Sequence, residues 1–276
     1  ESNDKGIKYY IQNTLDLLEN AIKLRTKKFT KVKLGLSGGV DSRIMLELLK
    51  RNFSNVSTFT YGTGSEFVEN FIAKKISNII NVKHKYINIP RGSYIQFANN
   101  SLEKTNSILT TNMAPQLKIF NNFVDKNSCF IFGTFLDYLI GNSGYQRKIF
   151  NIKKFSELQN YYLNGAVVKY KKNEFIKFFD DSKVGTRIYD SIISSVSNSL
   201  KNIEYDNIPN LNNSFFFSNR GKRWHNNTLI PVIMKNQIII PSYDKNFLDF
   251  ISKIPIKYKK NDYFRLKLLE KINRRL

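Results

Sequence analysis

Short apolar runs alternate with longer stretches of helical periodicity in the first half of the chain. The apolar runs predict buried strands at Val32–Leu36, Val56–Tyr61, His84–Ile89 and Cys129–Gly133. The stretches between them place apolar residues on one helical face and predict helices at about Asp41–Arg51, Glu66–Ile80, Ser93–Ile108 and Ala114–Asp125. Strands that alternate with helices indicate an α/β fold with a parallel sheet.

Strands become scarce after about Gly144, so the C-terminal half is expected to be largely helical. The polar stretch Asp206–Asn213 is expected to be a connection. Helical periodicity in this half marks Ser156–Leu163, Phe175–Phe179 and Ile188–Leu200.

We expect one domain over residues 1–276, with a core sheet at about 30–145 and a mainly helical cap and closing segment at about 146–276. The chain has 276 residues, of which 41% are hydrophobic, and this composition excludes a disordered chain and allows a sizeable core. Because the chain begins at Glu1 rather than at a methionine, it is open whether it is a fragment of a longer protein.

The single cysteine, Cys129, excludes an internal disulfide and a thiolate metal cluster, and it fits a reducing compartment. No apolar run reaches the length that a membrane-spanning helix needs. We therefore expect a cytoplasmic protein that does not span a membrane.

The charge is strongly positive, with 44 Lys and Arg against 22 Asp and Glu and a formal net charge of +22. Such a surface attracts RNA, nucleotides or anionic lipid headgroups without choosing among them. A compositional bias that puts lysine on solvated faces explains the excess equally well. RNA therefore stays open as a partner.

The candidate chemistry lies between the first predicted strand and its helix, where Leu36 is followed by the string S-G-G-V-D-S over Ser37–Ser42. Glycines let the backbone approach an anion closely, and the following helix presents unpaired N–H groups. The two serines add hydroxyl donors, and Asp41 offers a hard oxygen suited to Mg²⁺ beside phosphate. These features predict a phosphate-binding turn.

The Walker pattern is absent because no lysine follows the glycines, so γ-phosphoryl transfer of the usual P-loop kind is not expected. A strand-to-helix turn with two glycines also occurs for purely structural reasons. On the glycines alone, that alternative stays open.

The full S-G-G-x-D-S string resembles the pyrophosphate-binding loop of the ATP pyrophosphatases, which include asparagine synthetase, GMP synthetase, NAD synthetase and several tRNA-modifying enzymes. The resemblance implies a parallel sheet of the adenine-nucleotide alpha-hydrolase (PP-loop) type. It also implies cleavage of ATP to AMP and pyrophosphate, in which a substrate oxygen attacks the α-phosphate while the loop and Mg²⁺ hold the leaving pyrophosphate.

A second segment, Phe132–Gly141, resembles the asparagine synthetase stretch G-E-G-A-D-E-L-F-G. Gly133 and Asp137 match; in the family the glycine lies beside the nucleotide and the aspartate is a second ligand of the Mg²⁺-pyrophosphate. Thr134 and Tyr138 replace family glutamates, which implies a weakened or altered acceptor step. Taken alone, the segment also fits the start of an ordinary helix.

A third segment, Pro241–Pro255, is similar to the family block R-P-F-L-D-x-x-F-L-D, and Arg220 and Arg223 lie upstream of it. The arginine that begins the family block is absent here. An amphipathic helix and a solvated basic face explain the same residues. Taken together, the resemblance runs from about Ile7 to Tyr263.

Ligands of open α/β sheets bind at the carboxyl ends of the strands, which places Ser37, Tyr61 and Gly133 on one rim. Phe59 and Tyr61 would then line an adenine pocket, although both also fit ordinary strand core.

The resemblance implies an ATP-dependent ligase that adenylates a carboxylate, releases pyrophosphate and forms an amide with ammonia or an amine. The residues that we assign as catalytic and as Mg²⁺ ligands are Asp41 and Asp137. Those assigned to ATP and pyrophosphate are Leu36, Ser37, Gly38, Gly39, Asp41, Ser42, Phe59, Tyr61 and Gly133. Weaker candidates for substrate contacts are Arg43, Thr134, Arg220 and Arg223.

The glutaminase domain of asparagine synthetases, with its N-terminal cysteine nucleophile, has no counterpart in this sequence, so ammonia would come from a separate glutaminase domain or subunit. Two alternatives remain. A tRNA-modifying ATP pyrophosphatase is favoured by the charge. A catalytically silent nucleotide-binding domain is favoured by Thr134, Tyr138 and the short C-terminus.

Overall fold

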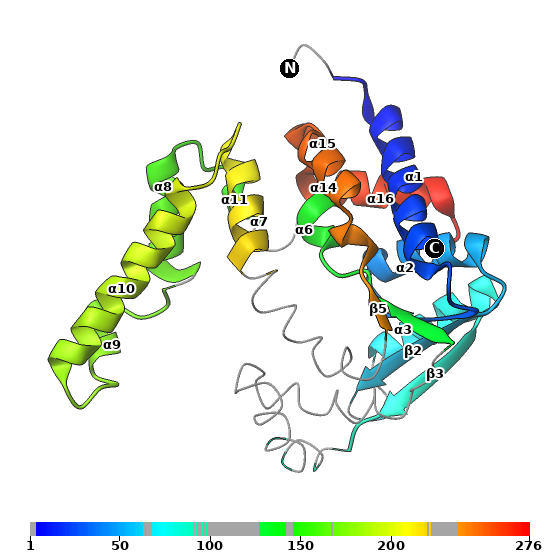
Figure 1. Ribbon diagram of the computed structural model, residues 1–276, viewed down its shortest axis with the longest axis horizontal. Helices are drawn as coiled ribbons and strands as arrows, with labels where there is room; N and C mark the ends of the chain where they lie inside the picture. Colours follow the sequence, from blue (N-terminus) through cyan, green and yellow to red (C-terminus); the bar gives the residue numbers. More distant parts are fainter. Residues whose placement is uncertain are drawn as a thin grey trace. The chain divides into compact units, whose positions relative to one another are not determined.

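The computed structural model describes residues 4–62, 64, 68–90, 92, 95, 98, 127–141, 146–166, 168–219, 221 and 237–276 (Figure 1). The chain divides into two compact units, one formed by Glu1–Asn142 with Gly221–Leu276 and the other by Ser143–Arg220. We call them the sheet unit and the helical unit and describe each by itself. Three expectations from the sequence lie outside the described residues: the helix at 93–108 apart from residues 95 and 98, the helix at 114–125, and the placement of Arg220 and Arg223.

A parallel sheet organises the sheet unit, and its strands follow the order β3-β2-β1-β4-β5. In register, Leu34 of the central strand lies opposite Thr58 on one side and Ile131 on the other. The expected α/β class is therefore confirmed. The strands span Lys31–Gly35 (β1), Val56–Gly62 (β2), Lys83–Asn88 (β3), Ser128–Ile131 (β4) and Gln237–Ile239 (β5).

Helices pack on one face of this sheet and bury its apolar side chains in a common core (Figure 1). Val32 and Leu34 of the central strand are fully buried there, together with Leu18 from the first helix and Phe264 from the last. The helices span Ile7–Thr26 (α1), Val40–Asn52 (α2), Val68–Ile80 (α3), Leu136–Ile140 (α6), Lys245–Ser252 (α14), Ile256–Lys259 (α15) and Tyr263–Ile272 (α16).

Two elements of the sheet unit have no counterpart in the sequence-based expectations. Helix α1 buries Leu15, Leu18 and Ile22 in the core. Strand β5 pairs with β4 and forms one edge of the sheet. The three residues of β5 are too few for a periodic pattern to be read from sequence.

The helical unit has its own core, which includes Leu158, Leu200, Leu211 and Phe215. Its helices span Gln146–Ile149 (α7), Phe155–Tyr161 (α8), Lys172–Ile176 (α9), Ser182–Lys201 (α10) and Ile208–Phe216 (α11). The largely helical character expected after Gly144 is confirmed for the described residues of this unit.

The prediction of a connection at Asp206–Asn213 is wrong from Ile208 onward, where α11 begins. The side chain of Asn207 caps the helix by accepting a hydrogen bond of 3.0 Å from the backbone N–H of Asn210. A proline in the first turn suits a helix start, and Leu211 is completely buried. Of the polar residues that suggested a loop, Asn207 is therefore a helix cap, and Asn212 is buried in α11, where its Oδ1 accepts a hydrogen bond from the Tyr162 hydroxyl.

The described part of the chain contains no helix that is long and apolar enough to cross a membrane.

A lysine lies inside the core of the sheet unit. Lys259 on α15 is only 3% exposed, and its Nζ donates a 2.7 Å hydrogen bond to the carbonyl of Ile251. Burial lowers the pKa of Lys259 from its ordinary value of 10.5 to about 8. The carbonyl of Ile251 also accepts hydrogen bonds from the backbone N–H groups of Lys253 and Ile254, so it keeps partners without the lysine.

We predict that Lys259→Met raises the free energy of unfolding at pH 7 by up to about 3 kcal/mol, because it removes a buried ammonium. The folded-state pKa is lower than the unfolded-state pKa, so the cost of burying the charge is fully present below pH 8 and disappears as the pH rises to 10.5. Urea unfolding across this range measures both effects. The exposed Lys253→Met is the control, and an unchanged stability of the Lys259 variant would contradict the prediction.

Candidate functional site

The candidate site is built on the turn from β1 into α2. Strand β1 ends at Gly35, and α2 begins at Val40 after an extended Gly39 at its N-cap, which carries no side-chain cap. A Cβ atom on Gly35 would lie 3.2 Å from the ring of Phe132, and one on Gly38 would lie 3.3 Å from Ile72. The glycines therefore allow close packing, and the first N–H groups of α2 are not capped by a side chain.

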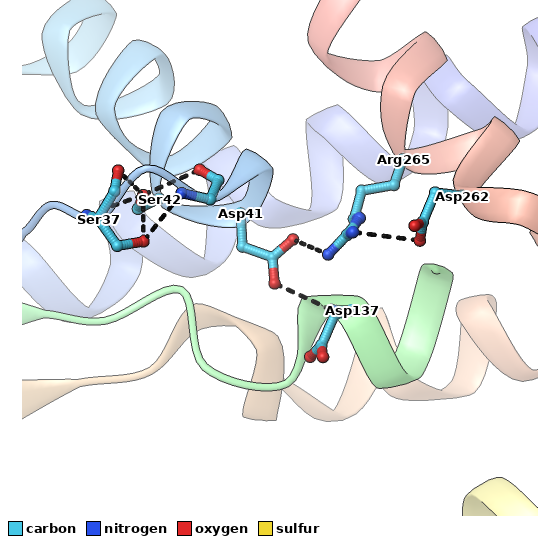
Figure 2. A network of polar contacts seen from close by, with 7 residues as sticks. Ser37, Asp41, Ser42, Asp137, Asp262 and Arg265 are labelled. Atoms are coloured by element: carbon cyan, nitrogen blue, oxygen red, sulfur yellow. Dashed lines mark hydrogen bonds and ion pairs between the residues drawn. The ribbon is translucent and has the colours of Figure 1, made fainter. Parts of the chain in front are cut away.

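The hydroxyl groups of Ser37 and Ser42 form a hydrogen bond to each other across this turn (Figure 2). The Ser42 Oγ lies 3.2 Å from the Ser37 Oγ and accepts a 3.2 Å hydrogen bond from the Ser37 backbone N–H. The Ser37 Oγ in turn accepts a 3.1 Å hydrogen bond from the N–H of Gly39. The turn is thus held in a preformed shape by its own side chains.

Asp41 and Asp137 meet although they are far apart in sequence. The backbone N–H of Asp137, in the first turn of α6, donates a 3.0 Å hydrogen bond to Oδ2 of Asp41 in the first turn of α2 (Figure 2). Gly133 allows this approach, because a Cβ there would lie 3.2 Å from the main chain of Asp41. Just before α6, Phe135 adopts a left-handed conformation with φ of 73°. The structure therefore brings Gly133, Asp41 and Asp137 together.

An arginine that sequence reasoning missed completes the cluster. Nη1 of Arg265 lies 3.0 Å from Oδ1 of Asp41, and Nη2 lies 3.1 Å from Oδ1 of Asp262 (Figure 2). One feature of the sequence could have pointed to this residue. Arg265 is the only arginine between Trp224 and Asn273, a stretch rich in lysine. An isolated arginine among lysines suggests a site that needs a planar fork of donors.

Burial dominates the electrostatics of the two aspartates. It raises the pKa of Asp41 to about 7; the guanidinium of Arg265 opposes this rise and the charge of Asp137 adds to it. Burial also raises the pKa of Asp137, again against the effect of Arg265. The negative charge of the pair is therefore incompletely compensated by the protein.

The donor set fits Mg²⁺. This ion is commonly held by one or two carboxylates together with substrate phosphates, and Asp41 and Asp137 supply two carboxylates beside the turn that the sequence predicts to bind phosphate. Within the described residues, no group of three or more His, Cys, Asp or Glu side chains gathers to hold a metal ion. We therefore expect the phosphates of a nucleotide to complete the coordination.

The remaining assigned residues lie around this turn in different ways. Arg43 donates to the carbonyl of Gly38 at 2.7 Å, so it braces the turn. The carbonyl of Thr134 accepts a 2.6 Å hydrogen bond from the Ser242 hydroxyl, which ties the Pro241–Pro255 segment to the loop before α6. Phe59 lies on the sheet face opposite the large core.

Phe59 is 2% exposed and packs edge-to-face on Phe130, with ring centroids 5.7 Å apart. Tyr61 is half-buried and packs against the same small cluster. Leu36 is buried, and its backbone N–H donates to the carbonyl of Phe59. These contacts belong to strand packing, and the adenine-pocket assignment stays a prediction.

The raised pKa of Asp41 predicts a pH-dependent metal affinity. Below pH 7 the carboxyl group is protonated, and a proton then competes with the metal ion for the same oxygen. We expect the affinity for Mn²⁺, a spectroscopic substitute for Mg²⁺, to fall about tenfold per pH unit below pH 7 and to level off above it. Electron paramagnetic resonance of free Mn²⁺ measures it, and an affinity independent of pH would count against Asp41 as a ligand.

Gly141 predicts a steric test of the cluster. A Cβ there would lie 2.8 Å from the carbonyl oxygen of Asp137 and 2.8 Å from Oδ1 of Asp262. We expect Gly141→Ala to shift both groups, to destabilise the protein by about 1–3 kcal/mol and to weaken Mn²⁺ binding. Thermal unfolding and Mn²⁺ titration are the measurements. The control is Gly92→Ala, where a Cβ meets nothing within 4 Å, and equal effects of the two variants would refute the prediction.

Several solved structures are similar to this chain. The NMN synthetase of Francisella tularensis has 19% sequence identity and a TM-score of 0.33, with 50% of this chain and 58% of that chain covered. The NH3-dependent NAD synthetase of Campylobacter jejuni has 19% identity and a TM-score of 0.32, with 82% and 96% covered. The U34-tRNA thiolase of Methanococcus maripaludis has 14% identity and a TM-score of 0.37, with 95% and 72% covered. No curated protein matches the sequence.

Residues 13–124 match the family model of asparagine synthase, and this range contains the S-G-G-V-D-S turn. It also contains the first three strands of the sheet and the helices α2 and α3. The match to this family model agrees with the resemblance that the turn motif indicates.

Proposed function

We propose that the protein is an ATP-dependent ligase that adenylates a carboxylate, releases pyrophosphate and forms an amide with ammonia or an amine. The family match supports an ATP-using enzyme. The single observation that carries the finer proposal is the contact between Asp41, at the end of the S-G-G-V-D-S turn, and Asp137.

In this proposal the turn binds the β- and γ-phosphates of ATP. The backbone of Gly38 and Gly39 lies at the uncapped start of α2, where the positive end of the helix dipole attracts anions. Ser37 and Ser42 would exchange their mutual hydrogen bonds for bonds to phosphate oxygens. The turn thus binds the group that becomes the leaving pyrophosphate.

Asp41 and Asp137 would hold Mg²⁺, which, when bound, neutralises the charge that develops on the pyrophosphate. A carboxylate oxygen of the substrate attacks the α-phosphorus, and the bond to the bridging oxygen of pyrophosphate breaks. The nitrogen of ammonia or an amine then attacks the acyl carbon, and AMP leaves. The contribution of the protein is positioning and charge stabilisation.

The nitrogen source and the cellular location belong to the proposal as well. A separate glutaminase domain or subunit would supply ammonia, and the cytoplasm is the expected compartment. Arg43, Thr134 and the two arginines upstream of the Pro241–Pro255 segment remain proposed contacts for anionic substrate groups.

A second candidate function is the modification of tRNA by the same ATP chemistry, and the net charge of +22 favours it. A protein of this charge that neutralises RNA phosphates should lose affinity steeply as the salt concentration rises. The two functions differ in the substrate that receives the adenylate, a small carboxylate or an RNA base.

The exchange of radiolabelled pyrophosphate into ATP with Mg²⁺ distinguishes the candidates. It is run with aspartate, with a pool of amino acids and small peptides, and with bulk tRNA. Exchange with one acid supports the ligase, and exchange with tRNA alone supports the second candidate. ATP binding without any exchange would instead support a catalytically silent domain.

We predict that Asp41→Ala and Asp137→Ala each lower the exchange rate by at least roughly 100-fold, because each removes a carboxylate from the metal that stabilises the leaving group. The matched control is Asp190→Ala, which removes an exposed carboxylate paired with Lys172 in the helical unit. An Asp41→Ala protein that exchanges pyrophosphate at the normal rate would overturn the assignment.

A further inference from the structure

Arg265 holds two carboxylates at once. Its guanidinium reaches Oδ1 of Asp41 at 3.0 Å and Oδ1 of Asp262 at 3.1 Å (Figure 2). The side chains of Arg265 and Asp41 are 16% and 20% exposed, so this ion pair is largely withdrawn from solvent. An ion pair in such surroundings is screened less than one on the surface.

The pairing occupies an oxygen that the proposed function needs. Asp41 uses Oδ2 for the backbone N–H of Asp137 and Oδ1 for Arg265. In the described part of the chain, Arg265 is the one cationic side chain in an ion pair with Asp41. A metal ion that binds the Oδ1 atom must therefore replace the guanidinium.

We propose that Arg265 is an internal counter-ion that competes with Mg²⁺ for Asp41 and is retained by Asp262 when the metal ion binds. Arg265 is thus a positioning residue of the site. The inference rests on the proposed function, because that function assigns Mg²⁺ to Asp41.

When a metal ion replaces the guanidinium at Asp41, only the side chain of Arg265 has to move, because the helix that carries it is anchored. Helix α16 is anchored in the core by Phe264 and Leu268, which are fully buried. Its C-terminal end is anchored on α2, where the Asn273 amide donates to Oε1 of Glu47. The Nε atom of Arg265 is buried and has no hydrogen-bond partner among the described residues. Within this part of the chain, the guanidinium therefore makes its polar contacts through Nη1 and Nη2, to Asp41 and Asp262.

Asp262 is placed to keep the guanidinium near the site. It lies directly before α16 in a left-handed conformation with φ of 58°, three residues ahead of Arg265. Its carboxylate faces Gly141, where a Cβ atom would lie 2.8 Å away. The arginine therefore needs only to release one of its two partners, and the charge of Asp262 offsets the repulsion between a bound cation and the released guanidinium.

The test is Mn²⁺ binding to the whole protein without nucleotide, measured by electron paramagnetic resonance. Arg265→Met is expected to bind Mn²⁺ at least roughly tenfold more tightly than the wild type, because the competing cation is gone. Asp262→Asn is expected to weaken binding several-fold, because Arg265 then has Asp41 as its remaining carboxylate partner. Asparagine tolerates the left-handed backbone at this position.

A double variant distinguishes two explanations of the Asp262→Asn effect: retention of Arg265 by Asp262, or a direct effect of the Asp262 charge on the metal ion. If Asp262 acts through Arg265, then Asp262→Asn has no further effect on Mn²⁺ binding in the Arg265→Met background. A direct effect of the charge predicts additive effects instead, and additive effects would overturn the proposal. So would an Arg265→Met protein whose Mn²⁺ affinity is unchanged or weaker.

Lys267→Met is the matched control, because it removes one positive charge from the same helix at an exposed pair with Glu270. Its Mn²⁺ affinity should equal that of the wild type. If Arg265→Met does not fold, Arg265→Lys serves in its place. The lysine keeps the positive charge but lacks the planar fork of N–H donors that reaches two carboxylates. Tighter Mn²⁺ binding by this variant than by the wild type supports the proposal. Equal or weaker binding by the lysine variant would refute it.

Pyrophosphate exchange by the same proteins keeps the two proposals apart. If exchange requires Asp41 but the Arg265 variants bind Mn²⁺ like the wild type, then the counter-ion proposal fails and the ligase proposal stands. If the Mn²⁺ affinities change as expected but no acid and no tRNA supports exchange, then the ligase proposal fails and the counter-ion stands.

Discussion

The carboxylate of Asp41 joins three segments that are far apart in sequence. One oxygen accepts the backbone N–H of Asp137 at the start of α6, and the other accepts the guanidinium of Arg265 on α16. A buried carboxylate is costly unless its oxygens are paired, so these partners must come very close. Glycines stand at two close approaches around this carboxylate: a Cβ atom would lie 3.2 Å from the main chain of Asp41 at Gly133 and 2.8 Å from Oδ1 of Asp262 at Gly141. The local architecture follows from the need to pair this one charged group.

The pairing leaves the site electrostatically incomplete. Burial raises the pKa of both Asp41 and Asp137, and Arg265 compensates only part of their charge. The uncapped N-terminus of α2 lies beside them and favours anions. Carboxylates that attract a cation and a helix end that attracts phosphate form, together, a site suited to a metal–nucleotide complex. This complementarity is the physical basis of the function that we propose.

Helix α2 is held along its length by the C-terminal segment of the chain. Arg43, Glu47 and Arg51 lie at intervals of four residues and therefore share one face of the helix. Glu47 accepts from the amide of Asn273, and Arg51 donates to the carbonyl of Ile272. Arg43 also braces the turn itself through the carbonyl of Gly38. The turn that we propose to bind phosphate is thus followed by a helix with several anchoring contacts, which suits catalysis by positioning.

The sequence by itself determined the features that neighbouring residues encode: the strand–turn–helix around Ser37–Ser42, the parallel α/β class and the resemblance to the asparagine synthetase family. It failed where short-range patterns are weak, as for β5, or where polar residues serve as helix caps, as at Asn207. It predicted Asp41 and Asp137 as site residues from motifs, but the ion pair of Asp41 with Arg265 links residues 224 positions apart. Only tertiary packing decides such a contact, because the free energy of pairing a charge depends on which groups the fold buries beside it.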